Sequence, residues 1–580
     1  MKKILLYQTI FISCITFAQN YDGLDINGVI FRSAQNNSSW IGANLSNVVF
    51  ESTTLRNSNF TDANLSNVIF YGCSLGNVNF TNANLLNVNF SSVDLTNLNI
   101  SYMWSKPGME YGYTYSGKSV NEIKESDIST TNFTDANIEG TSFIGTNYFR
   151  GCNITKEQLY STASYKNKNL RGIKLGYFPI PSHITTGKSY WPDLHGYDFT
   201  EQDLTNAIFL FCDGIDMANF TDAIVQGARL TGITSEQLYS TASYKNKDLT
   251  GIIIGSSIEN WNLSNQNLTN ANFSSCRSLI DTNFSNTIIE GANFTNPTNY
   301  NKTSKLRNYN EDITKEQLYS TLSYRNKNLT GIIFNGNELN GWNFTGQNLT
   351  NAEFKNVTLI ETDFTCADLR GALFENSDNY ITKNTIMADG RIEKFSMVSS
   401  DDNFSIRKYV PASEGGEMIS AKISETAAIS GGAALTLENG AELEVLNAAD
   451  FIVKNGSSIF IKNHADSSTS FKVNSGGGLA FENGAILEIN VVSDMSARDT
   501  LQIVIMDFDD GARIAGVDAL IKDETIQLSV NGSKWLGEWD YALENNQMVL
   551  SIAIPEPSAF AAIFSALALG LALKYRNYKN

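Results

Sequence analysis

The sequence predicts a mainly β protein in which most of the chain winds into stacked coils. Three observations predict this fold. Bulky apolar residues recur at every fifth position, a helical motif recurs with start points 79 and 80 residues apart, and a later region alternates apolar and polar residues around Asn-Gly pairs. The expected order is several blocks of four-sided coils separated by short helices, a second solenoid-like β region, and a C-terminal hydrophobic helix.

The clearest periodic stretch covers residues 41–100, where every fifth residue is large and apolar and the residue two places earlier is smaller. A helix repeats every 3.6 residues and a half-buried strand every two, so neither produces this pattern. A right-handed coil with four sides and about twenty residues per turn does, provided that neighbouring coils stack. The pattern extends to Leu95 and Ile100, and the core positions it predicts most clearly are Leu45, Phe50, Leu55, Phe60, Leu65, Phe70, Leu75, Phe80, Leu85 and Phe90.

The segments "ANLSN", "DANLSNVIF" and "NANLLNVNF" resemble the motif A(D/N)Lxx of the pentapeptide-repeat family. This resemblance implies a right-handed quadrilateral β-helix, in which each large side chain stacks on its equivalent one coil away.

Charge and cysteine content argue against several classes of function. The net charge of the 580 residues is −18, so nonspecific binding to nucleic acid is not expected. Residues 401–554 hold 23 Asp and Glu against 10 Lys and Arg, whereas residues 41–100 have a net charge of only −2. The six cysteines are scattered and none forms a CxxC pair, so we interpret them as small buried filler rather than a disulfide or zinc framework.

Residues 1–18 have the features of a secretory signal peptide: Lys2 and Lys3, an apolar stretch, and a small residue at the end. Cleavage after Ala18 is favoured over lipid attachment at Cys14, because Phe11 occupies a place where Leu is usual.

Residues 19–153 are predicted to form the first block of coils, with a loop insertion at residues 101–126 that is rich in Gly and Tyr. A second aromatic insertion spans residues 176–198. Because loops on rigid scaffolds commonly carry binding function, four aromatic residues of these insertions are candidates for recognition. They are Trp104, Tyr113, Tyr190 and Trp191. The alternative is that these rings cover apolar coil edges.

Residues 154–380 are predicted to form three modules, each of a short helix followed by coils. Their motifs begin at Ile154, Ile233 and Ile313. In each motif a Thr is followed three places later by Gln, which is a capping box, so Thr155, Thr234 and Thr314 are the expected N-caps. The module resembles one found in exported bacterial pentapeptide-repeat proteins.

Residues 381–411 lose the period and are predicted to be a linker. Residues 412–554 contain two related segments, "LTLENGAELEV" at 435–445 and "LAFENGAILEI" at 479–489, in which an Asn-Gly turn separates two alternating strands. The region resembles the passenger β-helices of autotransporter-like surface proteins, and a sandwich built from hairpins is the alternative.

The C-terminal residues 555–580 begin with Pro555, Glu556 and Pro557, continue through the apolar residues 558–573, and end with basic residues that include Arg576. An apolar helix of this length, about 24 Å at 1.5 Å per residue, is marginal for crossing a bilayer. The segment resembles the PEP-CTERM sorting signal. That resemblance implies transient or stable membrane anchoring and an exosortase-type peptidase as partner, and an ordinary tail anchor is the alternative.

The sequence contains no motif for nucleophilic catalysis, phosphate binding or metal ligation. Its histidines are His183, His195 and His464, and Asp507–Gly511 is only part of a calcium loop. No catalytic, cofactor-binding or metal-binding residue is therefore predicted. We expect a non-enzymatic, exported structural or adhesive solenoid of the cell envelope or extracellular matrix, with an envelope polysaccharide or protein as partner.

The sequence leaves two alternative functions open. One is a protein-binding pentapeptide-repeat module of the DNA-mimic type. The other is a carbohydrate-active β-helix enzyme that uses clustered carboxylates.

Overall fold

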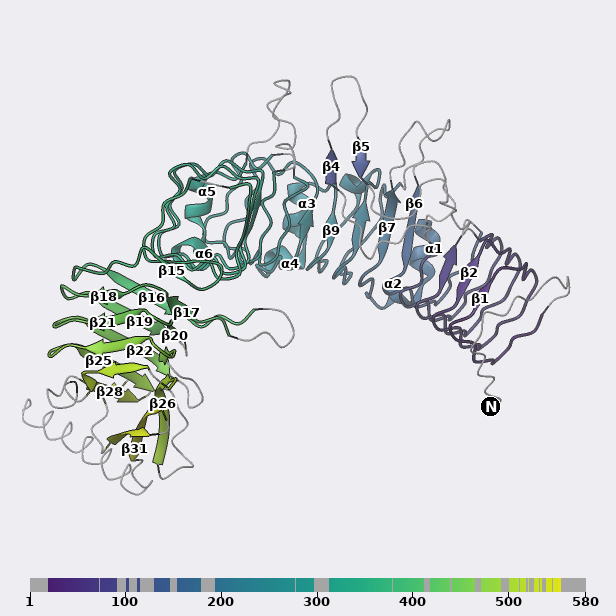
Figure 1. Ribbon diagram of the computed structural model, residues 1–580. Coiled ribbons are helices and arrows are strands. Elements are labelled where there is room, and N and C mark those ends of the chain that lie inside the picture. The colour runs from purple at the N-terminus through teal and green to yellow at the C-terminus, as the bar shows by residue number, and fades with distance from the viewer. Residues whose placement is uncertain are drawn as a thin grey trace, which may run out of the picture. The chain divides into compact units, whose positions relative to one another are not determined.

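The structure is a computed structural model (Figure 1). It describes residues 19–71, 73–90, 101–103, 112–114, 130–146, 154–178, 193–276, 278–296, 312–377, 379–411, 418–438, 441–464, 471–491, 500–510, 512–517, 520, 526–530, 533–534, 539–544 and 546–553. The chain forms two compact units. The first contains Met1–Asn326 and Ile332–Glu338, and the second contains Lys327–Gly331 and Leu339–Asn580.

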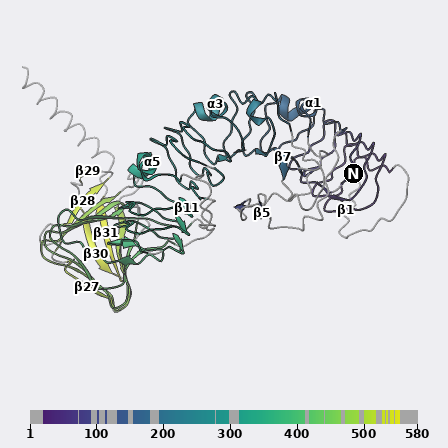
Figure 2. The same cartoon turned by 90° about the horizontal axis from the view of Figure 1, so that it is seen from above.

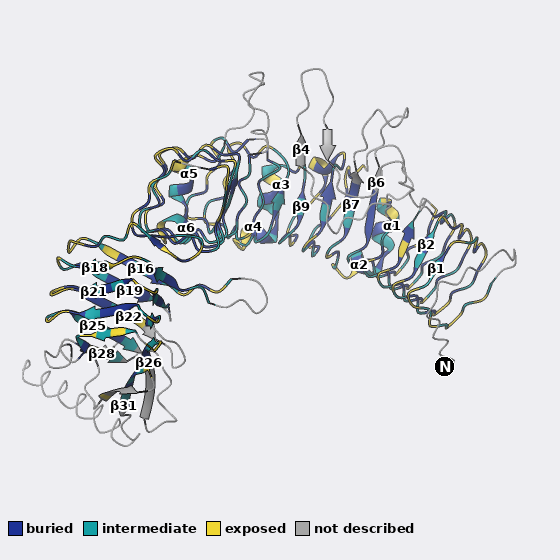
Figure 3. Ribbon diagram, in the orientation of Figure 1, coloured by how far each residue is buried: buried dark blue, intermediate teal, exposed yellow. Residues whose placement is uncertain are grey.

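The first unit is a stack of coils whose backbones pair in parallel. Phe50 pairs with Phe70, and bridges such as Asn44↔Asn64 and Asn59↔Asn79 also join residues twenty positions apart. The ten side chains predicted for the coil core, from Leu45 to Phe90, are all fully buried. Figure 3 shows these inward-facing positions in dark blue. The mainly β solenoid expected from the period of five is confirmed.

One ladder of short strands runs the whole length of this unit. Its strands are β1 (Ile30–Phe31), β2 (Val49–Glu51), β3 (Ile69–Tyr71), β6 (Ser142–Thr146), β7 (Lys174–Phe178), β8 (Ile208–Leu210), β9 (Arg229–Leu230), β10 (Ile253–Ile254) and β11 (Ile333–Asn335). Single bridges through Asn89 connect β3 to β6, and bridges through Asn272 and Asn293 connect β10 to β11. The coil stack of the first unit is therefore unbroken.

Asparagine supplies two recurring parts of each coil. One set, exemplified by Asn64, lies in the ladders: its Nδ2 donates to Oδ1 of Asn44 at 2.9 Å, and its Oδ1 accepts from Nδ2 of Asn84 at 2.9 Å. The other set stands at the corners with positive φ, for example 60° at Asn47 and 57° at Asn57. Asn tolerates this left-handed conformation better than most residues. The Asn-rich composition thus has a structural cause.

Three helix pairs replace one side of a coil each. They are α1 (Lys156–Ser161) with α2 (Ala163–Lys166), α3 (Ser235–Ser240) with α4 (Ala242–Lys245), and α5 (Lys315–Ser320) with α6 (Leu322–Arg325). A 3-10 turn, η3 (Ile215–Met217), precedes α3. Figure 2 shows α1 and α3 along the same edge of the first unit.

The predicted run of regular coils to Ile100 is wrong in one respect. Phe133, not Ile100, stacks on Phe80 with ring centroids 5.7 Å apart, and Asn132 bridges to Asn79. The chain therefore leaves the regular path after Phe90, and Leu95 and Ile100 lie outside the described residues. Within the predicted loop 101–126, β4 (Ser101–Met103) and β5 (Gly112–Thr114) pair as an antiparallel hairpin.

The second unit begins with further five-residue repeats, which include β12 (Glu353–Lys355) and β13 (Leu373–Glu375). The predicted linker 381–411 is instead folded. Ile386 bridges to Asp368 in the coil on one side, and Arg391 bridges to Lys422 on the other. β14 (Thr385–Ile386) and β15 (Ile392–Glu393) form an antiparallel pair between these bridges. The loss of period marks a change of coil type rather than a break in the stack.

The rest of the second unit is a β-helix with three sheets. The first contains β16 (Asn403–Arg407), β19 (Ala434–Glu438), β22 (Ser458–His464), β25 (Ile486–Val491), β28 (Ile526–Val530) and β29 (Ser533–Lys534). The second contains β17 (Ala421–Ile423), β20 (Leu443–Val445), β23 (Phe471–Val473), β26 (Thr500–Phe508), β31 (Gln547–Ala553) and β30 (Trp539–Glu544). The third contains β18 (Ala427–Ile429), β21 (Asp450–Val453), β24 (Gly478–Phe481) and β27 (Arg513–Ala515).

From β16 to β28, successive strands enter these three sheets in turn and pair in parallel with the coil before, which excludes the hairpin-built sandwich for this part. The last strands, β29, β30 and β31, pair antiparallel. The Asn-Gly segments are not hairpins. β19 and β20 belong to different sheets, as do β24 and β25, and Gly484 between the latter has φ 81° at the corner. An Asn-Gly pair separates two strands in each segment, but these two strands belong to different sheets and pair with strands of neighbouring coils.

Among the residues that the structure describes, no helix combines the length and the apolar character needed to cross a membrane. The predicted C-terminal hydrophobic helix lies outside them.

Candidate functional site

The three expected helix caps are formed. Thr155 accepts a hydrogen bond from the backbone N–H of Gln158, whose side chain accepts one from the backbone of Thr155, and the same capping box occurs at Thr234 and Thr314. Sequence reasoning missed the second helix of each pair. Its N-caps are Thr162, Thr241 and Thr321, each of which accepts from the N–H three residues later.

Each helix pair is bonded into the coil stack beneath it. Gln158 Nε2 donates to the carbonyl of Thr131 at 2.8 Å, and Ser164 Oγ accepts from the N–H of Ile138 at 2.8 Å. Gln237 and Ser243 make the equivalent contacts in the second module. The helix pairs thus satisfy backbone groups that a coil would otherwise satisfy.

The paired tyrosines of the motif hold the next coil. The rings of Tyr160 and Tyr165 stack at 4.2 Å, the Tyr160 hydroxyl accepts from the N–H of Asp198 at 2.6 Å, and the Tyr165 hydroxyl donates to the carbonyl of Asp198 at 2.8 Å. Tyr239 and Tyr244 bracket Asn262 in the same way. Burial is the main reason that the pKa of Tyr165 is raised above its usual range. The repeated motif therefore serves folding.

Replacing Thr234 with Ala is expected to destabilise α3 by about 1 kcal/mol, because the N–H of Gln237 loses its acceptor. Hydrogen exchange of the amides in residues 235–245 measures this loss. Ser235→Ala is the matched control, since Ser235 does not cap α3. Equal protection in the two variants would contradict the capping role.

The buried cysteines are structural fillers. Cys73 Sγ lies 3.1 Å from the carbonyl of Phe50, and Cys276 Sγ lies 3.2 Å from that of Ile254. Burial raises the pKa of the Cys73 thiol to about 12, so its reactive thiolate is scarce at neutral pH.

The polar candidates do not assemble a reactive site. His195 Nδ1 lies 2.6 Å from Asp193 Oδ1 in an exposed turn, which raises the pKa of this imidazole. Asp509 and Asp510 accept from Ser475 and Asn546 respectively. In the part of the chain that the structure describes, no group of three or more His, Cys, Asp and Glu is placed to hold a metal ion.

The remaining site predictions lie where the structure gives no side chains. Trp104, Tyr190, Trp191 and the sorting residues Pro555, Glu556, Pro557 and Arg576 lie outside the described residues, as does His183. Tyr113 lies in β5, where its backbone pairs with that of Tyr102.

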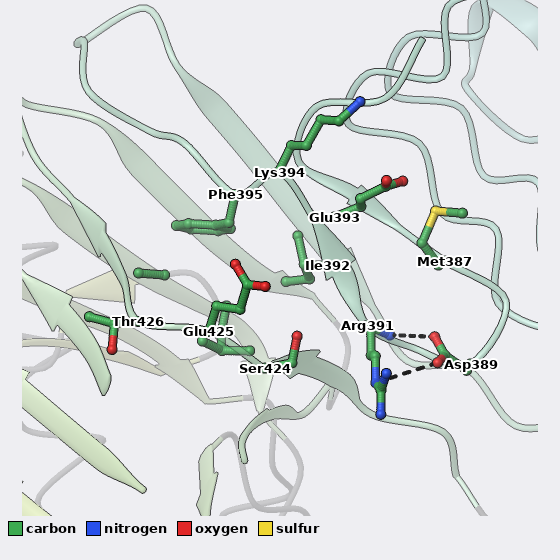
Figure 4. A pocket seen from close by; sticks show the side chains of 12 residues that line it. Met387, Asp389, Arg391, Ile392, Glu393, Lys394, Phe395, Ser424, Glu425 and Thr426 are labelled. Atoms are coloured by element: carbon green, nitrogen blue, oxygen red, sulfur yellow. Dashed lines mark hydrogen bonds and ion pairs between the residues drawn. The ribbon is translucent and has the colours of Figure 1, made fainter. Parts of the chain in front are cut away.

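The second unit has a groove of about 350 Å³ between the β14–β15 pair and the turn from β17 to β18 (Figure 4). Arg391 Nε lies 3.5 Å from Asp389 Oδ2 along one wall. The Phe395 ring packs against Phe451, with centroids 5.8 Å apart. Glu393, Lys394 and Glu425 also line the groove (Figure 4). The groove therefore offers an anchored aromatic ring and charges of both signs, which suit contact with a polar partner.

Comparison with protein families identifies the coils. The family described as "Pentapeptide repeat region" matches residues 43–104, and "Pentapeptide repeats (8 copies)" matches residues 262–296 and 338–376. The chain contains pentapeptide repeats. These matches confirm the resemblance seen in the sequence.

Two of the solved structures that match this chain share little sequence identity with it. HetL, a pentapeptide repeat protein involved in heterocyst differentiation regulation from the cyanobacterium Nostoc, is 14% identical with a TM-score of 0.15, over 65% of this chain and 92% of its own. QnrB1, a plasmid-mediated fluoroquinolone resistance protein, is 11% identical with a TM-score of 0.11, over 41% of this chain and 92% of its own. No curated protein sequence matches the chain.

Proposed function

We propose that this pentapeptide-repeat protein is a non-enzymatic structural or adhesive solenoid, exported to the cell envelope or extracellular matrix. The observation that carries the proposal is the unbroken strand ladder from Ile30 to Ile333 in the first unit. A continuous hydrogen-bonded stack with a buried Leu and Phe core is suited to a spacer, because each coil is held by both of its neighbours.

The side chains along the coils support the same proposal. The Asn side chains that give the first coils their polar surface bond to equivalent Asn residues of neighbouring coils. Such groups stabilise the stack. The groove beside Phe395 is a described surface that suits an adhesive contact, since charged side chains line it and its aromatic ring packs against Phe451.

Export rests on the sequences at the two ends. The basic and apolar residues 1–18 have the order of a signal peptide, and residues 555–580 have the order of a sorting signal read by an exosortase-type peptidase. In this proposal the C-terminal segment anchors the protein in the membrane, transiently or stably.

Intact mass measurement of the protein from fractions of its native cell tests the proposal. We expect a product that begins after Ala18, lacks the residues after the Pro555–Pro557 motif, and occurs in the outer envelope or matrix. A variant with Pro555→Ala and Pro557→Ala should keep the tail. A full-length chain in the cytoplasm would contradict export and with it the envelope role.

A further inference from the structure

Within the second unit, an arginine lies buried where the pentapeptide coils give way to the β-helix. The Arg370 side chain is 1% exposed and that of its partner Asp368 is 3% exposed. Arg370 Nε donates to Asp368 Oδ1 at 3.0 Å, and Nη2 donates to Asp368 Oδ2 at 2.6 Å. A buried pair of this kind persists only when its other donors are also satisfied.

Those other donors reach out of the coil and into the chain that builds the β-helix. Arg370 Nη1 donates to the carbonyl of Ile419 at 2.6 Å, and Nη2 also donates to the carbonyl of Arg407. These carbonyls belong to the end of β16 and to the residues just before β17. One guanidinium therefore joins a coil to the end of β16 and to the residues just before β17.

Tyr409 makes a second connection beside the first. Its ring lies 5.5 Å from the guanidinium carbon of Arg370, and its hydroxyl donates to Oδ1 of Asn351, one coil below. It also covers Gly371, where an added Cβ would collide with the Tyr409 hydroxyl. Tyr409 thus contacts two successive coils.

A coil of this type also forms with a residue other than arginine at this position. The residues Asp368-Leu369-Arg370-Gly371 stand in the same ladder as Asn328-Leu329-Thr330-Gly331, since Asn328 bridges to Asn348 and Asn348 to Asp368. The corresponding arginine of the first module, Arg171, is 48% exposed and pairs with Asp203 at 3.0 Å. Of these two arginines, Arg370 is the one that contacts Arg407, Tyr409 and Ile419.

We propose that Arg370, held by Asp368, is a clamp that makes the pentapeptide coils of residues 339–377 and the β-helix unfold as one cooperative unit. Without the clamp, coils of two different types would meet mainly through backbone bridges, and each would open on its own. This inference concerns folding and does not depend on the proposed location or role of the protein.

The test is the double change Asp368→Asn with Arg370→Thr in the full-length protein, which copies the Asn328–Gly331 sequence and so suits a coil. Hydrogen exchange is followed in residues 339–365 and in residues 403–438. In the wild type we expect both segments to exchange through one shared opening. In the double variant we expect exchange of residues 403–438 to rise on the order of a hundredfold while residues 339–365 keep their protection.

Arg171→Thr is the matched control, because it makes the same change at an exposed position of the equivalent motif. It should leave exchange in both segments unchanged. Tyr409→Phe, which removes only the hydroxyl, should also raise the exchange of residues 403–438 relative to residues 339–365, by a smaller factor than the double change does.

Two results would overturn the clamp. The first is separate exchange of the two segments already in the wild type. The second is exchange in the double variant that is unchanged, or raised equally in both segments, because either would place the coupling elsewhere.

Discussion

Phe80→Asp is expected to unfold the coils around Phe80. The Phe80 side chain is fully buried between Phe60 and Phe133, whose ring centroids lie 5.1 and 5.7 Å away. Removing a buried Phe costs about 3–5 kcal/mol, and the new carboxylate has no partner in this column. Because coil stability depends on contacts with neighbouring coils, the loss should spread to the coils on both sides.

The matched control is Ile69→Asp on the neighbouring strand β3. The Ile69 side chain points outward and is 39% exposed, so the new charge remains in water. Circular dichroism and hydrogen exchange of residues 41–90 measure both variants. We expect exchange protection to be lost in Phe80→Asp and almost unchanged in Ile69→Asp. Equal melting of Phe80→Asp and the wild type would show that the inward register is wrong.

The free energy of unfolding is expected to depend on pH through Asp312, which lies just before α5. Burial raises the pKa of this carboxyl from 3.8 to about 6, although hydrogen bonds from the Glu338 backbone and the Asn296 side chain act in the opposite direction. The charge of Glu338 raises it further. The folded state therefore binds the proton more tightly than the unfolded chain does.

The direction of the pH dependence follows from this difference in proton affinity. The contribution of Asp312 is fully present below about pH 4 and is lost as the pH rises through about 6. The difference between a pKa of about 6 in the folded state and 3.8 in the unfolded chain corresponds to a change of about 3 kcal/mol in the free energy of unfolding. The stability of the wild type minus that of Asp312→Asn should thus fall by this order between pH 4 and pH 6 and stay constant above.

Denaturant unfolding of both proteins at several pH values measures the difference. Asp281→Asn is the control, because Asp281 is exposed at a corner with φ 51°, where Asn is common in this chain. A difference between wild type and Asp312→Asn that does not change from pH 4 to pH 7 would exclude Asp312 as the titrating group.

Much of the coil architecture could be predicted because its rules are local. The period of five specifies which side chains point inward, and the ten core side chains that it predicts between Leu45 and Phe90 are all buried. The capping box at Thr234 spans only four residues, so its hydrogen bonds are visible in the motif. The second helix of each pair was missed because Thr241 ends one helix and begins the next, and that double use has no spacing signature.

The sequence predictions that were wrong concern features that depend on contacts with residues far along the chain. After Phe90 the described coils continue with residues 130–146, where Phe133 stacks on Phe80 although it lies far along the chain. The Asn-Gly turn before β25 follows the local rule for a hairpin, but its strands pair with coils before and after it instead of with each other. Residues 381–411 lack the period of five because they join two kinds of coil.

The sequence by itself determined that the chain contains pentapeptide coils, which residues form their core, and where the first helix of each pair begins. These features depend on residues within one turn of each other. Only the tertiary structure decided that Arg370 is buried and Arg171 exposed, although both follow a Leu in the same coil position. The reason is that Arg407, Tyr409 and Ile419, which cover Arg370, come from far along the chain, and no local pattern predicts their contact with it.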